Sequence, residues 1–480
     1  MTKTSSWASA LIIMLLALPP KVFAQNSLQQ TLTERFVRYA KINTQSEYDA
    51  KTSPTSEGQK TFANLLAQEL KEIGASNVRV DENYYVFAEI PATVKYAPVI
   101  FLSSHMDTTP DEDLKGKNPK PVVHEYKGGD LKINNDYTLT TADDTYLASA
   151  AGGNIITSDG NTIIGGDDKA GVSVIMTIAE QLVKNKKIKH GTVKIIFTTD
   201  EEIGDGTKHL TKDKIAADYG LVLDGRGFGR LATENFNAAD FKITVKAPPA
   251  GHPGAQTLPS ATFMKDDILQ LFPRDLRPYT TKDTQGYASY YKVEETGTQC
   301  TIFGRIREHD AQAFEHLKDM VSDITAYYTN YINAKYKDHA DAITISLQIN
   351  DSYKNSKEIL KNYPDNYNLL LAAYQKAGVT PKLEAARGGS DANDITFMGV
   401  PAYNLFAGFH NEHSPKEWVS SVHMQGAFNV VMKYIEGWAE KAAKEYDKNQ
   451  QEKLKKDIIK SVGNTNKQDS GKINIVLPKF

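Results

Sequence analysis

The chain has only one cysteine, Cys300, in 480 residues. A single cysteine cannot form an internal disulfide, and it excludes a cysteine-rich metal knuckle. A large excess of one charge is also absent, because 56 Lys and Arg residues stand against 59 Asp and Glu residues, a net charge of −3. Proteins that bind nucleic-acid phosphates usually carry a basic excess, so we expect no nucleic-acid partner. The hydrophobic fraction of 40% is typical of a globular protein, and the length predicts two or more domains.

Long hydrophobic runs are scarce as well. Residues 10–18 form an apolar run of nine, and no other stretch approaches the ~18 apolar residues of a membrane span. Lys3 precedes this run, Pro19 and Pro20 end it, and Ala24 closes a small-x-small cleavage pattern. The pattern predicts that residues 1–24 are a signal peptide and that the mature protein is exported, most simply to a bacterial periplasm.

The next part of the chain alternates buried strands with helical patterns. Residues 98–103, 193–198 and 221–223 are short apolar runs, and residues 171–184 have apolar side chains at helical spacing. This alternation predicts an α/β domain, a mixed sheet with helices on both faces.

The pattern changes after residue 235. Residues 241–245 and 342–349 alternate like half-exposed strands, and residues 311–332 form an amphipathic helical pattern. We therefore predict a smaller α+β domain, residues 236–350, inserted into a larger domain made of residues 25–235 and 351–447. A charged C-terminal extension follows at residues 448–480.

Acids and histidines gather where the predicted strands end. His105 and Asp107 follow the first strand at a spacing that suits a metal-binding imidazole with a carboxylate on its second nitrogen. Asp167 and Asp168 lie in a glycine-bracketed turn at a helix start, where Asp168 caps the helix or Asp167 bridges metal ions. Each short pattern alone also occurs in ordinary proteins without any metal.

Three further segments complete this set. Glu201 and Glu202 follow the strand at 193–198, and Asp224 ends the next strand. Far downstream, His413 adds an imidazole, with His410 as a competing candidate three residues earlier. The carboxyl ends of strands are where α/β sheets bind ligands, and mixed histidine and carboxylate ligands favour a two-metal hydrolytic site, most simply zinc.

The motifs resemble one family when they are taken in order. The segments are SSHMDT, GGDDKAG, TTDEEIG, LDGRGFG, ENFNAA, HPG, ARGGSD and NEHSPKEWV. They are similar to the co-catalytic zinc peptidases, which include carboxypeptidase G and acetylornithine deacetylase, and most of all to the tripeptide aminopeptidases known as peptidase T. The resemblance covers residues 34–442. It implies a catalytic domain with two Zn²⁺ per subunit, interrupted by a lid that mediates a homodimer.

The resemblance also implies a role for each residue of the metal site. Glu201 is the expected general base on a metal-bridging water, and Asp107 is expected to fix the tautomer of His105. The peptide bond between Asp167 and Asp168 is expected to be cis. The expected zinc ligands are His105, Asp167, Glu202, Asp224 and His413, with Asp167 bridging both ions.

Three more residues carry over to substrate binding. His252 matches a lid histidine that reaches into the partner's site and polarises the scissile carbonyl, with a simple turn histidine as the alternative. Arg307 and Arg387 match arginines that bind the substrate carboxylate, because a guanidinium pairs with a carboxylate bidentately.

The expected activity is release of the N-terminal residue from tripeptides. The alternative is a related zinc carboxypeptidase, dipeptidase or N-acyl amino acid deacylase on the same fold. The chain departs from the cytosolic peptidase T pattern in its signal peptide. Residues 305–310 lack the usual aromatic residue between two acids, and this departure bears on substrate length.

Overall fold

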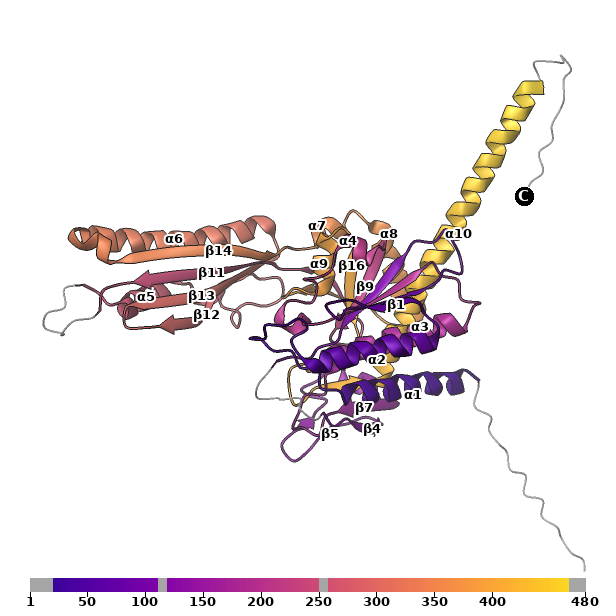
Figure 1. Cartoon of the computed structure of the whole chain (residues 1–480), viewed down its shortest axis with the longest axis horizontal. Coiled ribbons are helices and arrows are strands. Elements are labelled where there is room, and N and C mark those ends of the chain that lie inside the picture. The colour runs from indigo at the N-terminus through magenta and orange to yellow at the C-terminus, as the bar shows by residue number, and fades with distance from the viewer. Residues whose placement is uncertain (1–19, 111–118, 250–257, 466–480) are drawn as a thin grey trace, which may run out of the picture.

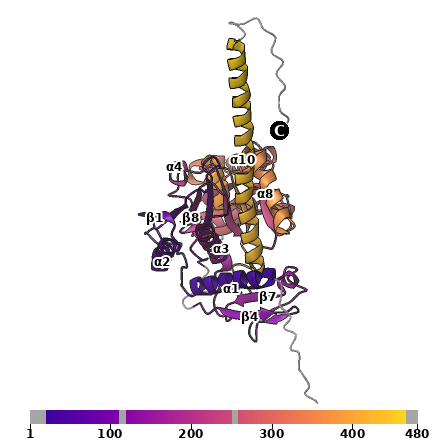
Figure 2. The same ribbon diagram turned by 90° about the vertical axis from the view of Figure 1, so that its right-hand side faces the viewer.

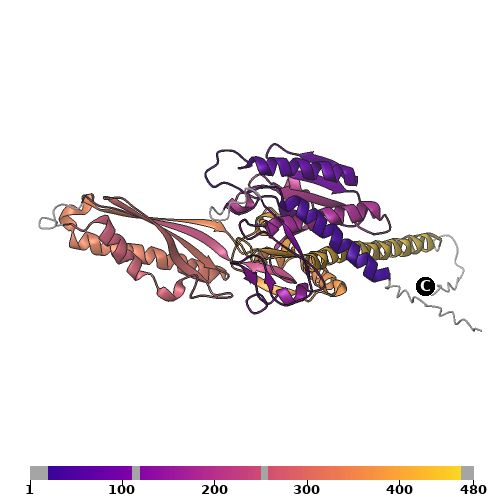
Figure 3. The same ribbon diagram turned by 90° about the horizontal axis from the view of Figure 1, so that it is seen from below.

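The computed structural model describes residues 20–110, 119–249 and 258–465. A compact α/β body carries a slender domain on one side, and the C-terminal half of a long helix projects alone from the body (Figure 1). A view from the side shows this helix standing clear of the body (Figure 2), and a view from below shows the slender domain on the opposite side from it (Figure 3). Most of the predicted signal peptide lies outside the described residues, and the predicted cleavage after Ala24 falls within helix α1 (Pro20–Ala40).

The body is built on an eight-stranded mixed sheet. Its central pairs β8–β3, β3–β9 and β9–β16 are parallel, while β1, β2 and β10 add antiparallel pairs. The strands, in spatial order, are β1 (Ser76–Val80), β2 (Val86–Ile90), β8 (Val193–Thr198), β3 (Ile100–His105), β9 (Tyr219–Gly225), β16 (Ala402–Phe406), β10 (Arg230–Asn235) and β15 (Lys382–Ala386).

Helices cover both faces of this sheet, which confirms the predicted fold class. The larger core lies under α1, α2 (Glu57–Ile73), α3 (Gly166–Lys184), α8 (Pro364–Ala377) and α10 (Ser421–Thr465). A smaller core on the other face lies under α4 (Lys212–Ile215) and α9 (Asp391–Phe397), and the one-turn helix α7 (Lys357–Leu360) precedes α8. All six residues of β3 are buried, as its continuous apolar run predicts for a strand covered on both sides.

A second, smaller sheet lies beside the body. Its order is β17 (Phe409–His410), β18 (Trp418–Ser420), β7 (Gly153–Thr157) and β4 (Val122–Tyr126). A hairpin of β5 (Leu131–Lys132) and β6 (Thr138–Leu139) and the short helix η1 (Leu147–Ala150) pack nearby. This unit positions the loop between β17 and β18, which carries His413.

The slender domain, called the lid below, has its own hydrophobic core. Its sheet is antiparallel throughout, and α5 (Ala261–Leu271) and α6 (Ala311–Lys335) pack on one face. Two short helices, η3 (Arg274–Leu276) and η4 (Lys337–Ala342), complete the lid. The sheet order is β12 (Tyr287–Glu295), β13 (Gln299–Glu308), β11 (Asn237–Lys246) and β14 (Thr344–Tyr353).

Buried asparagines join the two chain crossings between body and lid. Asn235 accepts hydrogen bonds from the Ser356 N–H at 2.9 Å and from the Asn393 amide at 2.7 Å. Asn355 donates its N–H to Asn237 at 2.9 Å and accepts from the Asn235 N–H at 3.3 Å. Because the asparagine side chains satisfy buried backbone groups of both crossings, the lid leaves the body as a firmly tied pair of strands.

Within the described ranges, no helix combines the length and apolar character that crossing a membrane requires.

A stack of aromatic rings fixes the start of α10 against the small sheet. His410 stacks on buried Trp418 with ring centroids 3.9 Å apart, and its Nε2 lies 2.8 Å from Nδ1 of His423. Phe228 stacks on His423, with ring centroids 4.4 Å apart. A hydrogen bond between two imidazoles needs one donor and one acceptor, so the two rings cannot both be protonated. Burial lowers the pKa of His423 to about 3.

This histidine pair predicts a loss of stability in acid. His423 has its folded pKa below the unfolded value of about 6.5, so the unfolded chain binds the proton first as pH falls. The free energy of unfolding should therefore decrease from about pH 6.5 downward. Between pH 7.5 and 5.5, His423→Gln should lose about 1.4 kcal/mol less than the parent. Urea unfolding at both values measures this, with exposed His316→Gln as control. An equal loss in parent and His423→Gln would contradict the pair's role.

Candidate metal centre

The predicted metal residues meet at the carboxyl ends of adjacent parallel strands. His105 ends β3, and Asp224 is the second-last residue of β9. The short helix η2 (Glu201–Ile203) follows β8, and the loop after β16 and β17 carries His413. Because these strands are parallel neighbours, their carboxyl ends bring residues far apart in the sequence to one edge.

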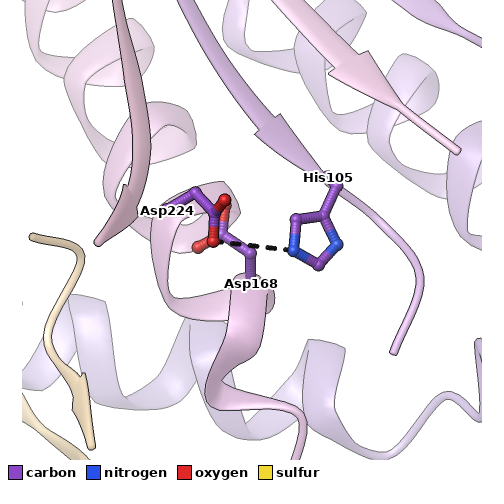
Figure 4. A group of neighbouring side chains, drawn as sticks. All are labelled: His105, Asp168 and Asp224. Carbon is purple, nitrogen blue, oxygen red and sulfur yellow. Dashed lines mark ion pairs between the residues drawn. The ribbon is translucent and has the colours of Figure 1, made fainter. Parts of the chain in front are cut away.

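His105 is the buried centre of the cluster. Its Nε2 lies 2.8 Å from Asp167 Oδ1, 3.7 Å from Asp224 Oδ1 and 4.0 Å from Glu201 Oε2. Figure 4 shows the carboxylates of Asp224 and Asp168 beside the same ring. Burial alone would lower the pKa of His105, but hydrogen bonds to Asp107, Asp167 and Asp224 raise it well above its usual value. The Nε2 atom of His105 faces these carboxylates, and it is placed to bind a cation together with them.

Asp107 holds the other side of the histidine and the loop beyond it. His105 Nδ1 lies 3.1 Å from the Asp107 backbone carbonyl and 3.4 Å from its carboxylate. The same carboxylate accepts the N–H groups of Glu201 at 3.0 Å and Glu202 at 3.1 Å. A fully buried acid therefore orients the imidazole and fixes the turn that presents both glutamates.

The two adjacent aspartates face different partners across a cis peptide bond. Asp168 accepts a hydrogen bond from the Gly171 N–H at 3.2 Å, which is a helix cap, and another from the Ser104 hydroxyl. Asp167 faces His105 and His413 instead, with its Oδ2 3.6 Å from His413 Nε2. Both aspartates have an oxygen close enough to His105 to share a cation with it, in groups that also include Asp224 or Glu202. Since Asp168 already accepts hydrogen bonds from Gly171 and Ser104, the carboxylate of Asp167 is the one that faces the two histidines.

His413 and Glu202 form the second half of the cluster. His413 Nε2 lies 3.0 Å from Glu202 Oε1. Hydrogen bonds to Asp167 and Glu202 raise the pKa of His413 to about 11. Burial and the charge of Asp167 raise the pKa of Glu202 to about 8 and that of Asp224 to about 6. Desolvated carboxylates this close to one another call for positive charge.

The competing histidine points elsewhere. His410 belongs to the ring stack described above and contacts His423 rather than an acid. Of His410 and His413, only His413 contacts the carboxylates of the cluster.

The cluster opens into a cavity of about 410 Å³ between the body and the base of the lid. Its wall includes seven carboxylates and three guanidinium groups, which leaves four negative charges when every acid is ionised and His413 is neutral, as metal ligation requires. The acids are Asp167, Glu201, Glu202, Asp224, Glu234, Glu384 and Glu412, and the arginines are Arg226, Arg230 and Arg387. Two divalent cations would bring the wall to neutrality.

The predicted substrate residues are placed differently. Arg387 lines the cavity, but its guanidinium donates to the carbonyl oxygens of Asp283 and Gln285 and to the Thr281 hydroxyl of the lid. Arg307 lies within the lid sheet, where it donates to the carbonyls of Ala239 and Ile306 and does not line the cavity. His252 lies outside the described residues.

Two buried acids support the site and were not predicted. The Glu417 carboxylate accepts the N–H groups of Ile164, Gly165 and Asp167 at 3.0–3.1 Å and so shapes the turn before α3. Asp391 accepts from the Thr198 hydroxyl at 3.1 Å, and burial raises its pKa to about 7. Glu417 follows a run of polar residues in the sequence, and no local pattern there marks it as buried.

An α/β domain with histidines and carboxylates gathered at the carboxyl ends of its parallel strands defines a metal-dependent hydrolase. A family profile described as peptidase family M20/M25/M40 matches residues 158–437. Peptidase T of Halothermothrix orenii is 36% identical over 416 residues, covering 85% of this chain and 99% of the relative. Peptidase T of Geobacillus kaustophilus is 36% identical over 427 residues, covering 87% and 100%.

Solved structures agree on the fold. Aminopeptidase PepT from Bacillus cereus has a TM-score of 0.65 and 22% identity, covering 86% of this chain and 99% of its own. A Staphylococcus aureus tripeptidase has the same TM-score, with 20% identity. The chain belongs to the M20/M25/M40 peptidase family, and it is a metal-dependent peptidase.

Glu417 provides a test of how the turn before α3 is held. In Glu417→Gln, an amide N–H must face backbone N–H groups that now donate to a carboxylate, which costs about 1–3 kcal/mol. We expect a melting temperature lower by several degrees and weaker metal retention, measured by thermal unfolding and metal analysis after gel filtration. Exposed Glu358→Gln is the control. Unchanged metal content and melting temperature in Glu417→Gln would refute this role.

Proposed function

We propose that the protein is a dizinc aminopeptidase that releases the N-terminal residue of tripeptides. The observation that carries this proposal is one cluster of five ligand-type side chains, of which all but His105 line the cavity: His105, Asp167, Glu202, Asp224 and His413. The 36% identity to proteins named Peptidase T over most of the chain supports the choice of substrate.

The donor set fits two zinc ions per subunit. Imidazole nitrogens and carboxylate oxygens are the ligands of catalytic zinc, and the four surplus negative charges of the cavity wall match two divalent cations. His105, Asp167 and Asp224 would hold one ion, and Glu202 and His413 would hold the other together with Asp167. When bound, the ions supply a Lewis acid for the scissile carbonyl and lower the pKa of the attacking water.

Glu201 is the proposed general base. Its backbone N–H is fixed by Asp107, and its carboxylate faces the cavity 4.0 Å from His105 Nε2. From this position the carboxylate accepts a proton from water and returns it to the leaving amine. Burial and neighbouring acids raise its pKa well above the usual value, and positive charge in the cluster is needed to keep it ionised.

Arg387 is the proposed partner of the substrate carboxylate. The guanidinium now donates to neutral lid carbonyls, and a charged carboxylate is a stronger acceptor. Arg307 and His252 are proposed to act from the lid, as the family resemblance implies.

We also propose export and pairing through the lid. The apolar run at residues 10–18 supports export. Large apolar side chains exposed on the lid support a homodimer there, among them Phe263, Tyr291 and Tyr327.

Hydrolysis of an unmodified tripeptide by the purified chain tests the function. We expect release of the N-terminal residue, loss of activity with a chelator and recovery with zinc, followed by mass spectrometry of the products. N-acetylated amino acids and longer peptides belong in the same panel. Release of the C-terminal residue, or turnover of the N-acetylated compounds alone, would favour the carboxypeptidase or deacylase alternative.

The base is tested separately by Glu201→Gln. This change keeps the backbone contact to Asp107 but removes the proton acceptor, so kcat should fall roughly 10²–10⁴-fold. Metal content should stay at two ions per chain. The matched control is Glu202→Gln, which should lose metal as well as activity. Full activity in Glu201→Gln, or metal loss equal to that of the control, would show that Glu201 is not the base.

A further inference from the structure

An enzyme that removes one residue from a free N-terminus must recognise the α-ammonium. Successive Cα atoms are 3.8 Å apart, so the group that binds this charge must lie within about one residue of the scissile bond. An ammonium has three donors and no acceptor, and a carboxylate on the cavity wall is its strongest partner.

Only a few acids of the wall are available for this task. Four of the seven carboxylates belong to the proposed metal centre and base, which leaves Glu234, Glu384 and Glu412. Both oxygens of Glu234 lie 3.0–3.1 Å from Lys357 Nζ. Glu384 forms a close ion pair with Arg230.

Glu412 has fewer ion-pair contacts than Glu234. Its Oε1 lies 2.7 Å from Arg226 Nη1, and among the described residues no contact is recorded to its second oxygen. The Glu412 side chain is 18% exposed and that of Arg226 is 57% exposed, so solvent weakens the attraction between them. A second cation can therefore bind this carboxylate without displacing the first.

The position of Glu412 places it beside the reaction centre. It directly precedes His413, and Arg226 follows Asp224 by two residues. Asn411 and His413, on either side of Glu412, both have left-handed backbone, with φ of 54° and 57°. Non-glycine residues rarely adopt this conformation, and it persists where the surrounding structure enforces it. The loop thus turns sharply around Glu412.

Three cavities meet at this side chain. Glu412 lines the metal cavity and two neighbouring cavities of about 370 and 240 Å³, and Arg226 lines the metal cavity and the smaller neighbour. The Arg226–Glu412 pair therefore forms the partition between the metal cavity and the side cavity of 240 Å³.

We propose that Glu412, held by Arg226, binds the α-ammonium of the substrate and restricts the enzyme to peptides with a free, charged N-terminus. The proposal rests on the aminopeptidase function proposed above. N-acylated substrates offer a neutral amide here and leave the carboxylate without its partner, which a site built for a charged group rejects strongly.

The test compares Ala-Ala-Ala with propanoyl-Ala-Ala, in which hydrogen replaces the α-amino group. The parent enzyme should prefer the tripeptide by at least about tenfold in kcat/KM. Glu412→Gln should reduce this preference to about one, chiefly by raising KM for the tripeptide. Glu412→Asp, which keeps the charge, should retain part of the preference. Glu440→Gln changes an ion-paired acid on α10, outside the cavity, and should keep the full ratio.

The possible outcomes distinguish a failure of the Glu412 proposal from a failure of the proposed aminopeptidase function. N-terminal release by the parent together with an unchanged ratio in Glu412→Gln would overturn the role of Glu412 and leave the aminopeptidase function intact. Release of the C-terminal residue by the parent would overturn the function itself. Where Glu412→Gln is inactive toward both compounds, a reduced preference in Glu412→Asp would support the role of Glu412, and the full parental preference in that variant would overturn it.

Discussion

The site depends on crowding many carboxylates around one buried imidazole. Ionised acids in a desolvated position repel one another, and their mutual repulsion must be offset by cations or by hydrogen-bond donors. The protein uses both means. Asp107 and Glu417 are satisfied by five backbone N–H groups between them, and neutral donors need no countercharge. Asp167, Glu201, Glu202 and Asp224 line the cavity instead, where cations can balance their charge.

The two acids that accept backbone N–H groups, Asp107 and Glu417, also explain how the loops of the site are held in place. Asp107 follows β3 and binds the turn after β8, while Glu417 precedes β18 and binds the turn before α3. Each buried acid thus joins two segments that are distant in the sequence. The metal-facing residues Glu202 and Asp167 sit on the joined turns, so their positions depend on backbone contacts more than on their own side chains. Pre-organisation of this kind lets a metal bind without the loops first having to be ordered.

Much of the fold and site could be predicted from the sequence. Strand β8 and helix α6 begin where their patterns do, because continuous apolar runs and helical spacing report burial directly. The acids at strand ends predicted the candidate cluster, because parallel strands bring their carboxyl ends together. Glu417 could not be found this way, since nothing in its neighbourhood marks a buried acid. The engagement of Arg387 by lid carbonyls depends on domain packing, which local patterns do not encode.

The charge pattern of the cavity bears on which peptides it can accept. With two divalent cations its wall is neutral overall, but the charges are separated in space, with Arg387 beside the lid and Glu412 at the partition near His413. A short peptide with free ends is likewise neutral overall and carries opposite charges at its two termini. Such a substrate matches both groups at once only when its length spans the distance between them. In the proposed enzyme, a fixed separation between a carboxylate and a guanidinium therefore selects for peptide length, and the asparagine-tied crossings at Asn235 and Asn355 keep that separation constant.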